Sequence, residues 1–441
     1  MSLKIESNLQ IKRVRVSDIR FPTSDELDGS DAVHSDPDYS GAYVVLETDQ
    51  QVEGHGLTFT IGRGTEVVCE ACRSLAPFIE GRQLSEIIGN FLEWYRSLTN
   101  DTQMRWIGPE KGVIHLATAA IVNAVWDLWA KVEGKPVWRL VCDLEPEELI
   151  ELIELRYCSD VLTAEEALEI LRDRAPNKAQ RINELEQNGY PAYTTSAGWL
   201  GYPDEKLRAL CEEGIAAGWN YFKIKVGQDI DDDKRRCRIV RETIGPDRFL
   251  MTDANQRWEV SEAIDWMTQL AEFKPLWIEE PTSPDDILGH QAIGEALRPL
   301  GIGIATGEAC QNRVIFKQLL ASGALDFCQY DSCRLGSINE ILAVMLMAAK
   351  LNVRCCPHAG GVGLCQYINH LIMIDYALIA GTSEGRVAEY VSHLHEHFVN
   401  PWRHRAGAYL LPTSPGYGIT MREESLQQYA YPDGPIWRAR L

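Results

Sequence analysis

The sequence has little basic charge, no long apolar run and no second C-x-x-C motif to complete a zinc site, and each absence excludes a class of protein. Its 441 residues contain 43 Lys and Arg against 64 Asp and Glu, a net charge of −21. Nucleic-acid binding needs a basic face, so we expect no nucleic-acid partner. The longest strongly apolar stretch that we identify, 341–349, is too short to span a bilayer. The N-terminus lacks the apolar core of a secretory signal. We therefore expect a cytoplasmic protein without a membrane partner.

Cysteine is present without the spacing of a zinc site. Of the 12 cysteines, Cys69 and Cys72 form a C-x-x-C pair, and no second close pair follows at a zinc-ribbon distance. Cys355 and Cys356 are adjacent. We interpret the set as reduced thiols that fill the core as small apolar residues.

A chain of this length predicts two domains, and the first has mixed α+β character. Strand-like patterns cover 11–21, 43–47 and 55–61, and helical periodicity dominates 66–148. The polar stretch 22–41 is rich in Asp, Ser and Gly, which is typical of a lid or binding loop. We assign 1–148 to this domain.

We expect residues 149–189 to form a helical connection between the two domains. Over 190–392 the pattern changes to short apolar strands that alternate with amphipathic helices. Eight such strands end 23–31 residues apart, the period of a repeated strand–helix unit, which predicts a (β/α)8 barrel. The ends fall near Ser196, Lys225, Asp253, Glu279, Glu308, Asp331, His358 and Glu389. The remaining segment, 393–441, does not continue the repeat, and we expect it to return to the first domain.

Acidic residues end three successive strands and predict a metal site. Asp253 and Glu308 end two of these strands, and the strand between them offers the adjacent pair Glu279 and Glu280. Neighbouring residues point to opposite faces of a strand, so spacing alone leaves the choice within the pair open. Carboxylates that converge without a cation repel one another, and oxygen ligands favour a hard ion, Mg²⁺ first.

The other strand ends supply acid–base groups. Lys223 and Lys225 lie two apart on one face of the second strand, where a nearby cation would lower the pKa of a lysine and let it act as a base. Asp331 and His358 end adjacent strands, so the carboxylate can orient the imidazole. Glu389 ends the eighth strand and is a candidate ligand for a substrate oxygen. Glycines after His358 would let backbone N–H groups approach an anion.

These motifs resemble a known family. Lys-x-Lys, Asp-x-Asn, Glu-Glu-Pro and Thr-Gly-Glu, followed by the Asp of strand six and the His of strand seven, look like the mandelate racemase group of the enolase superfamily. The resemblance covers nearly the whole chain and implies that the N-terminal α+β domain caps the barrel mouth. It also selects Glu279 over Glu280 as the third metal ligand.

Long segments, including RWIGPEKGVIHLATAAIVNAVWDLWAKVEGKPVW and CPHAGGVGLC, are similar to the L-fuconate dehydratase branch of that group. The resemblance implies a hydro-lyase that removes water from L-fuconate to give 2-keto-3-deoxy-L-fuconate. The implied roles are Asp253, Glu279 and Glu308 as Mg²⁺ ligands, Lys225 as base, His358 oriented by Asp331 as acid, and Lys223, Glu389, Asn255 and Ser196 as substrate contacts.

The capping domain should set specificity, and we expect Gly29, Ser30, Asp31, Tyr39 and the 105–106 region to contact the substrate. A small-molecule sugar acid and a homo-oligomer are the expected partners. Three alternatives stay open at this point. They are a dehydratase for another sugar acid such as L-galactonate or D-arabinonate, a racemase that uses Lys225 and His358 as opposed bases, and a non-catalytic binding or regulatory protein on the same fold.

Overall fold

The computed structural model describes residues 9–108, 110–401 and 403–440, and its N-terminal part contains the three predicted strands. β1 (Ile11–Arg20), β2 (Ser40–Thr48) and β3 (Gly54–Thr60) form an antiparallel sheet in chain order. The polar stretch between β1 and β2 contains one short 3-10 turn, Thr23–Glu26, and is otherwise a loop, as expected. The α+β character of this part is therefore confirmed.

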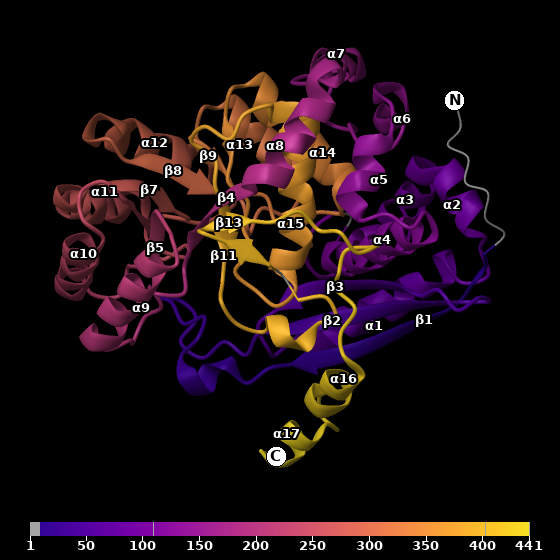
Figure 1. The fold of residues 1–441 in the computed structure, drawn as a ribbon, viewed down its shortest axis with the longest axis horizontal. Coiled ribbons are helices and arrows are strands. Elements are labelled where there is room, and N and C mark those ends of the chain that lie inside the picture. Colours follow the sequence, from indigo (N-terminus) through magenta and orange to yellow (C-terminus); the bar gives the residue numbers. More distant parts are fainter. Residues whose placement is uncertain (1–8, 109, 402, 441) are drawn as a thin grey trace.

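Helices cover one face of this sheet (Figure 1). The helices that lie on the sheet are α1 (Thr65–Leu75) and α4 (Gly112–Val132). The other helices of this part are α2 (Leu84–Gly89), α3 (Phe91–Thr99), α5 (Val137–Asp143) and α6 (Pro146–Ile150). The Ala-rich helix α4 lies directly on β3, where Gly54 and Gly56 allow a close approach of the two backbones. A Cβ at Gly56 would lie 2.0 Å from the carbonyl oxygen of Ala120, and one at Gly54 would lie 2.4 Å from that of Ala124. Small residues on both elements thus fix the distance between helix and sheet.

Helix α4 is also long and apolar enough to cross a membrane by length and composition, a feature not predicted from the sequence. The apolar window of this helix is 89% buried inside the protein. The helix is therefore covered by protein on nearly all of its surface. An apolar helix that is buried all round is typical of a protein core.

The second part is the predicted barrel of parallel strands. They are β4 (Tyr190–Thr194), β5 (Tyr221–Lys225), β6 (Phe249–Asp253), β7 (Pro275–Glu279), β8 (Gly303–Thr306), β9 (Phe327–Cys328), β10 (Arg354–Cys355) and β11 (Ala388–Tyr390). Neighbours pair in chain order from β4 to β10, and β11 pairs with β4. The amide of Glu389 donates to the carbonyl oxygen of Pro357 at 3.1 Å and closes the ring between β10 and β11.

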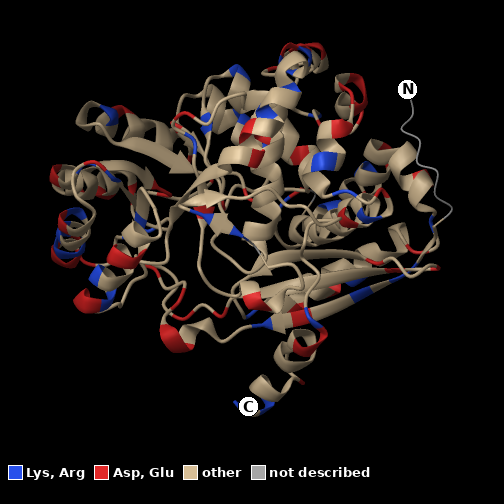
Figure 2. Ribbon diagram, viewed as in Figure 1, with Lys and Arg blue, Asp and Glu red and all other residues tan. Residues whose placement is uncertain are grey.

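Helices surround the barrel on its outside (Figure 1). They are α9 (Asp204–Ala216), α10 (Ile230–Ile244), α11 (Val260–Leu270), α12 (Ile287–Leu297), α13 (Arg313–Ala321), α14 (Ile338–Lys350) and α15 (Leu364–Asp375). Two further helices, α7 (Ala164–Arg174) and α8 (Lys178–Asn188), precede the first barrel strand. Figure 2 shows acidic and basic segments interspersed along these outer helices.

The inside of the barrel is packed in layers. Tyr193, Met251, Trp277, Phe327 and Val387 belong to one buried cluster in the interior. Side chains two residues apart share a face of a strand, so the residues two positions further along face the barrel axis at its C-terminal end. An apolar layer therefore supports the layer that carries the polar side chains.

The C-terminal segment contacts both parts of the protein. In the hairpin of β12 (His404–Arg405) and β13 (Ala408–Tyr409), β13 pairs antiparallel with Tyr190 and Pro191, the first residues of β4. Further on, α16 (Glu423–Tyr429) and α17 (Pro435–Arg438) lie against the N-terminal sheet (Figure 1). The Tyr431 amide donates to the Asp18 carbonyl oxygen, and the Trp437 indole to that of Arg20, both at 2.9 Å.

The contact between β3 and α4 predicts that Gly56→Ala destabilises the protein. The added Cβ meets backbone atoms of α4, which move only with the helix. We expect the free energy of unfolding to fall by at least ~2 kcal/mol, the size typical of overpacking a core. Urea unfolding followed by circular dichroism measures the change.

Gly41→Ala is the matched control on the neighbouring strand β2. Its Cβ would lie 3.4 Å from the nearest atom, the Thr58 carbonyl oxygen, which is an ordinary contact. Equal unfolding midpoints for the two variants would show that β3 and α4 do not need the glycine.

Candidate active site

The register of the barrel strands assembles the centre of the site. Lys225 pairs with Asp253 across β5 and β6, and Asp253 pairs with Glu279 across β6 and β7. Each of the three is the last residue of its strand. Glu308 lies two residues beyond the end of β8 and joins the group from the next position around the ring. Parallel strands in register thus place one lysine and three acids side by side.

Three carboxylates form a group that fits a divalent cation. Asp253, Glu279 and Glu308 each offer an oxygen atom, and these oxygens lie within 4.8 Å of one another. Burial raises the pKa of Glu279 well above its usual value, and the charge of Asp253 adds to the effect. Among the described residues, the buried Oε2 atom of Glu279 has no hydrogen-bond partner. An unpartnered carboxylate oxygen beside two further acids is what a hard-cation site offers.

The structure resolves the choice between the adjacent glutamates. Trp277 belongs to the interior apolar cluster, and Glu279 lies two residues further on the same face of β7. Glu280 instead accepts from the Gln256 side-chain amide at 3.0 Å, with a positive φ of 44°. Glu279 is therefore the glutamate that faces the acids of neighbouring strands.

The two lysines of β5 have different surroundings. Lys223 is fully enclosed, and its ammonium group lies 2.7 Å from Glu279, 2.8 Å from Glu389 and 3.3 Å from Asp253. Lys225 lines the open cavity and contacts Asp253 at 2.6 Å. Lys223 is thus held by three carboxylates, whereas Lys225 is the lysine that a substrate can reach.

The charges around Lys225 determine its pKa in the protein alone. Burial and the repulsion from Lys223 lower its pKa, but the carboxylates of Asp253, Glu308 and Asp31 together outweigh both, so the pKa rises. The expected lowering assumed that a cation dominates the site. The position of Lys225 on the cavity wall supports its role as base, and its pKa in the protein alone does not.

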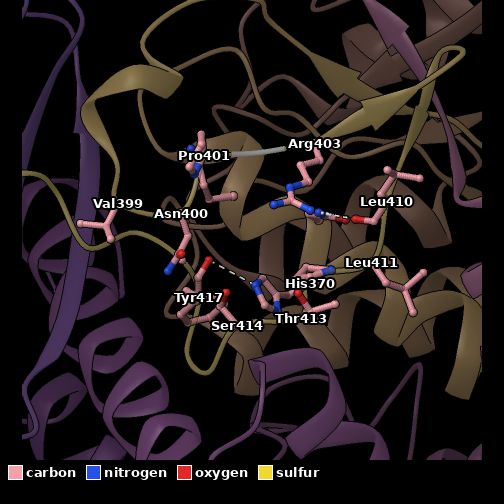
Figure 3. A pocket seen from close by; sticks show the side chains of 14 residues that line it. His370, Val399, Asn400, Pro401, Arg403, Leu410, Leu411, Thr413, Ser414 and Tyr417 are labelled. Carbon is pink, nitrogen blue, oxygen red and sulfur yellow. Dashed lines mark hydrogen bonds between the residues drawn. The ribbon is translucent and has the colours of Figure 1, made fainter.

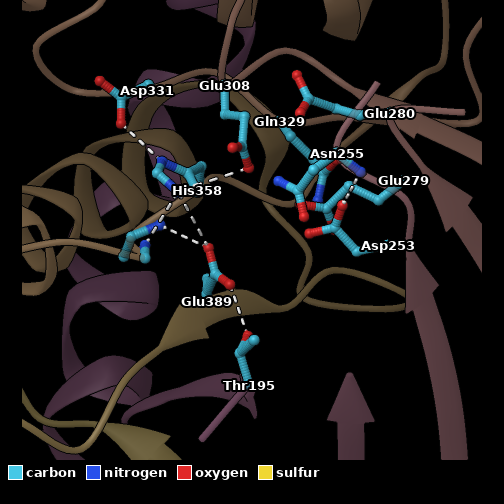
Figure 4. Close-up of polar contacts among 12 residues, drawn as sticks. Thr195, Asp253, Asn255, Glu279, Glu280, Glu308, Gln329, Asp331, His358 and Glu389 are labelled. Carbon is cyan, nitrogen blue, oxygen red and sulfur yellow. Dashed lines mark hydrogen bonds and ion pairs between the residues drawn. The ribbon is translucent and has the colours of Figure 1, made fainter. Parts of the chain in front are cut away.

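His358 is oriented by Asp331, as predicted. Its Nδ1 atom lies 2.8 Å from the Asp331 carboxylate, which fixes the ring with Nε2 directed toward Glu308 at 3.5 Å (Figure 4). Burial would lower the pKa of His358, but Glu308, Asp331 and Glu389 outweigh burial and raise it to about 10. Nε2 is therefore the ring nitrogen that is directed toward Glu308 and the cavity.

Glu389 is the acceptor of a dense set of hydrogen bonds. Thr195 donates to it at 2.6 Å, the Ala359 amide at 3.0 Å, and the Lys223 ammonium group lies 2.8 Å away (Figure 4). Burial would raise its pKa, but Lys223 and His358 outweigh burial and hold the pKa well below its usual value. An ionised Glu389 accepts hydrogen bonds and does not donate them, so it fits a substrate hydroxyl better than a carboxylate oxygen.

The structure corrects the assignment at the first strand. We expected Ser196 to contact the substrate, but β4 ends at Thr194, and the Ser196 hydroxyl accepts from the Ser392 amide at 3.0 Å. Thr195 is the residue that contacts Glu389. Alternation along the strand explains this position. Tyr193 points into the barrel interior, and Thr195, two residues further on, lies on the same face.

The glycine-containing loop after β10 also differs from expectation. Its amides do not form an open anion site, since the Ala359 N–H binds Glu389 and the Gly360 N–H lies 3.1 Å from Nε2 of His358. A Cβ at Gly360 would lie 2.9 Å from the same nitrogen. The glycine therefore makes room for the imidazole, and the loop positions two side chains of the site.

A cavity of about 460 Å³ lies between the barrel mouth and the capping domain. Of the predicted residues, its walls include Gly29, Asp31, Tyr39, Lys225, Asn255, Glu308, His358 and Glu389. Asn255 has a positive φ of 46°, and its buried Oδ1 atom has no partner within the described residues. The loop between β1 and β2 therefore lies over the barrel mouth, as predicted.

Two predicted contacts from the capping domain lie elsewhere. The Ser30 hydroxyl donates to the Leu200 carbonyl oxygen at 2.7 Å and so ties the loop to the barrel. Trp106 is 94% exposed, and neither it nor Arg105 is among the described residues of the cavity wall. Ser30 thus anchors the loop, and the 105–106 region does not reach the cavity.

Four residues that were not predicted from the sequence also line the cavity: His34, Arg63, Trp199 and Arg334. His34 binds Asp31 through Nδ1 at 2.9 Å, and this hydrogen bond raises its pKa against the effect of burial. An acid and a histidine three residues apart in a predicted lid loop were a usable signal. Arg63 and Arg334 could not be predicted in this way, because their spacing in the sequence does not relate them to the strand ends.

Comparison with known proteins agrees with this geometry. Residues 30–142 match the N-terminal domain model of mandelate racemase / muconate lactonizing enzyme, and residues 206–425 match the enolase C-terminal domain-like model. An L-galactonate dehydratase of Hypocrea jecorina is 54% identical over 97% of this chain and 95% of its own.

Two solved structures extend the likeness. The crystal structure of human mitochondrial enolase superfamily member 1 superposes with a TM-score of 0.97 at 58% identity, covering 98% of both chains. A racemase from Streptomyces coelicolor with bound magnesium has a TM-score of 0.73 at 25% identity, covering 95% of this chain and 99% of its own. The chain therefore belongs to the mandelate racemase group of the enolase superfamily.

Proposed function

We propose that the protein is a Mg²⁺-dependent hydro-lyase that removes water from a sugar acid of the L-galacto series, either L-galactonate or its 6-deoxy form, L-fuconate. The observation that carries this proposal is one cavity wall with Lys225 and His358 both beside the three-acid group. A base and an acid at one site are what elimination of water requires. The 54% identical relative named L-galactonate dehydratase supports the same class of reaction.

The substrate's reactive carbons would lie between the lysine and the histidine. Lys225 takes the C2 proton, and the Nε2 proton of His358 goes to the C3 hydroxyl, which leaves as water. The C2–H and C3–O bonds break, and the resulting enol becomes the 2-keto-3-deoxy acid. When bound by Asp253, Glu279 and Glu308, a divalent cation supplies Lewis-acid stabilisation of the negative charge that develops at the substrate carboxylate.

The remaining side chains position these groups. Asp331 holds the His358 ring, and Lys223 places a fixed positive charge beneath the site. Glu389 is suited to accept from a substrate hydroxyl. The loop between β1 and β2, which we call the cap loop, closes the cavity on the side away from the barrel through Asp31 and Tyr39. It thereby limits the access of water.

The first test is a screen of sugar acids with Mg²⁺. We expect L-galactonate and L-fuconate to yield 2-keto-3-deoxy products with kcat/KM values within about 100-fold of each other, because the acids differ by one hydroxyl at C6. D-arabinonate, which has one carbon fewer, is the third substrate. Product is followed by semicarbazone absorbance, and EDTA should stop turnover until Mg²⁺ is restored.

The same screen in D₂O separates elimination from racemisation. Absence of keto product with every acid would reject the dehydratase proposal. Deuterium at C2 of unreacted substrate in both configurations would favour the racemase alternative.

Two variants test the two proposed proton transfers separately. Lys225→Ala should lose both C2 exchange and dehydration, by about 10²–10⁴-fold, since the base is gone. His358→Asn should lose dehydration by a similar factor and still exchange the C2 proton, because Lys225 remains. Proton NMR in D₂O measures exchange and product together. Unchanged dehydration in His358→Asn would remove the histidine from the proposed reaction.

The hydrogen bond from Thr195 to Glu389 predicts that Thr195 affects activity by positioning this carboxylate. Thr195→Val keeps the shape of the side chain and removes a hydrogen bond to a carboxylate, so kcat/KM should fall about tenfold or more. Thr195→Ser keeps the hydroxyl and should restore activity at equal stability. If the valine and serine variants were equally active, Thr195 would have no positioning role.

A further inference from the structure

Two buried polar side chains outside the proposed catalytic set bind backbone groups in contrasting places. His370 lies in the wall of a cavity of about 290 Å³ between α15 and residues 399–418 (Figure 3). Its nitrogens contact the Trp138 amide and the Tyr417 carbonyl oxygen, so it joins segments that carry none of the proposed catalytic residues. Arg236, on α10, instead binds backbone groups of the proposed active site.

The guanidinium group of Arg236 donates to three backbone carbonyl oxygens. Nη1 donates to that of Lys225 at 2.5 Å, and Nη2 donates to those of Gly198 at 2.9 Å and Trp199 at 3.1 Å. The arginine is 2% exposed, and the Asp233 carboxylate lies 3.8 Å away as its countercharge. Hydrogen bonds from a charged donor are stronger than neutral ones, so this contact fixes the three carbonyl groups relative to one another.

These carbonyl groups belong to two segments that form one wall of the active-site cavity. Lys225 ends β5, Trp199 lies in the loop after β4, and both residues line the cavity. The Lys225 ammonium group lies 5.4 Å from the centre of the Trp199 ring. The indole therefore borders the proposed base, in an arrangement that attracts a cation.

The loop and the strand also contact each other directly. The Lys225 amide donates to the Gly198 carbonyl oxygen at 2.9 Å. A Cβ at Gly198 would lie 2.4 Å from the Lys223 carbonyl oxygen and 2.5 Å from the Cα atom of Ile224, so the absence of a side chain lets the loop approach β5. Arg236 thus binds the loop and the strand at the point where the two meet.

We propose that Arg236 is a positioning residue, which fixes the backbone of Lys225 and Trp199 and so places the Lys225 side chain for removal of the C2 proton. The inference rests on the reaction proposed above, in which Lys225 is the base. A displacement of about 1 Å can slow such a step about 100-fold. Arg236 is not among the described residues that line the cavity, so it acts only through the residues that it holds.

Helix α10 offers a matched control in Arg241. Its guanidinium group also donates to backbone carbonyl oxygens, among them those of Phe273 at 3.0 Å and Arg248 at 2.7 Å. These two residues directly precede β7 and β6, so the contacts lie at the end of the barrel opposite the cavity. Arg241→Lys should therefore affect stability and leave proton transfer unchanged.

The first measurement is amide hydrogen exchange by mass spectrometry, with Mg²⁺ and no substrate. Lysine lacks the planar fork that binds several carbonyl groups at once. In Arg236→Lys we expect the amides of 197–200 and 225–227 to exchange at least tenfold faster than in the unsubstituted protein, and in Arg241→Lys we expect no change there. Arg236→Gln, which leaves no buried positive charge, is the second variant should the lysine variant not fold.

The second measurement is exchange of the C2 proton of L-galactonate in D₂O, followed by proton NMR. Arg236→Lys should lower kcat for this exchange about 10–100-fold, because the base is displaced. KM should change less than threefold, because the metal-binding acids come from other strands. In Arg241→Lys both constants should stay within about twofold of the unsubstituted protein.

Equal kcat values for the two lysine variants, or unchanged amide exchange at 197–200 in Arg236→Lys, would overturn the proposal. A joint loss of stability and of kcat in both variants would point to a structural role alone. If amide exchange quickens but no sugar acid exchanges its C2 proton, the proposed reaction fails, and the hold of Arg236 on the Lys225 segment stands.

Discussion

The constraint on which this structure depends is the burial of like charges at one end of a barrel. Asp253, Glu279 and Glu389 are fully enclosed, and the ammonium group of Lys223 contacts all three. Removing one member of such a set leaves uncompensated charge in a region of low polarity, which is strongly unfavourable. The apolar layer beneath, which includes Met251 and Trp277, therefore has to hold the strands in register while the charges repel. A cation bound by the three acids would relieve the remaining repulsion.

Much of this could be predicted from the sequence because two simple periodicities determine it. A strand–helix period of 23–31 residues predicted the barrel, and a period of two along each strand determines which side chains face its axis. Lys225, Asp253 and Glu279 are the last residues of regular strands, so the rule applied to them directly. The localisation and the homo-oligomeric state, which depend on other molecules, stay predictions.

The same periodicities failed where the chain leaves the strands. Asp331 and His358 lie three residues beyond β9 and β10, and their pairing was identified from the order of strands and from residue chemistry. At β4 the strand end was placed at Ser196, although the period of two set by Tyr193 favours Thr195. The cap residues have no period at all. Their positions depend on tertiary contacts that no local pattern records.

Those tertiary contacts separate the task of binding from the task of catalysis. The cap loop is held to the barrel at two points, by the Ser30 hydroxyl on the Leu200 carbonyl oxygen and by the Tyr202 hydroxyl on Asp28. Between these anchors and β2, side chains such as His34 and Tyr39 reach the cavity without belonging to any barrel strand. Substitution of His34 can therefore change which sugar acid fits, whereas Asp253 and Lys225 stay fixed by strand pairing. Because a loop tolerates changes that a paired strand does not, the shape of this cavity can change while the side chains at the strand ends stay in place.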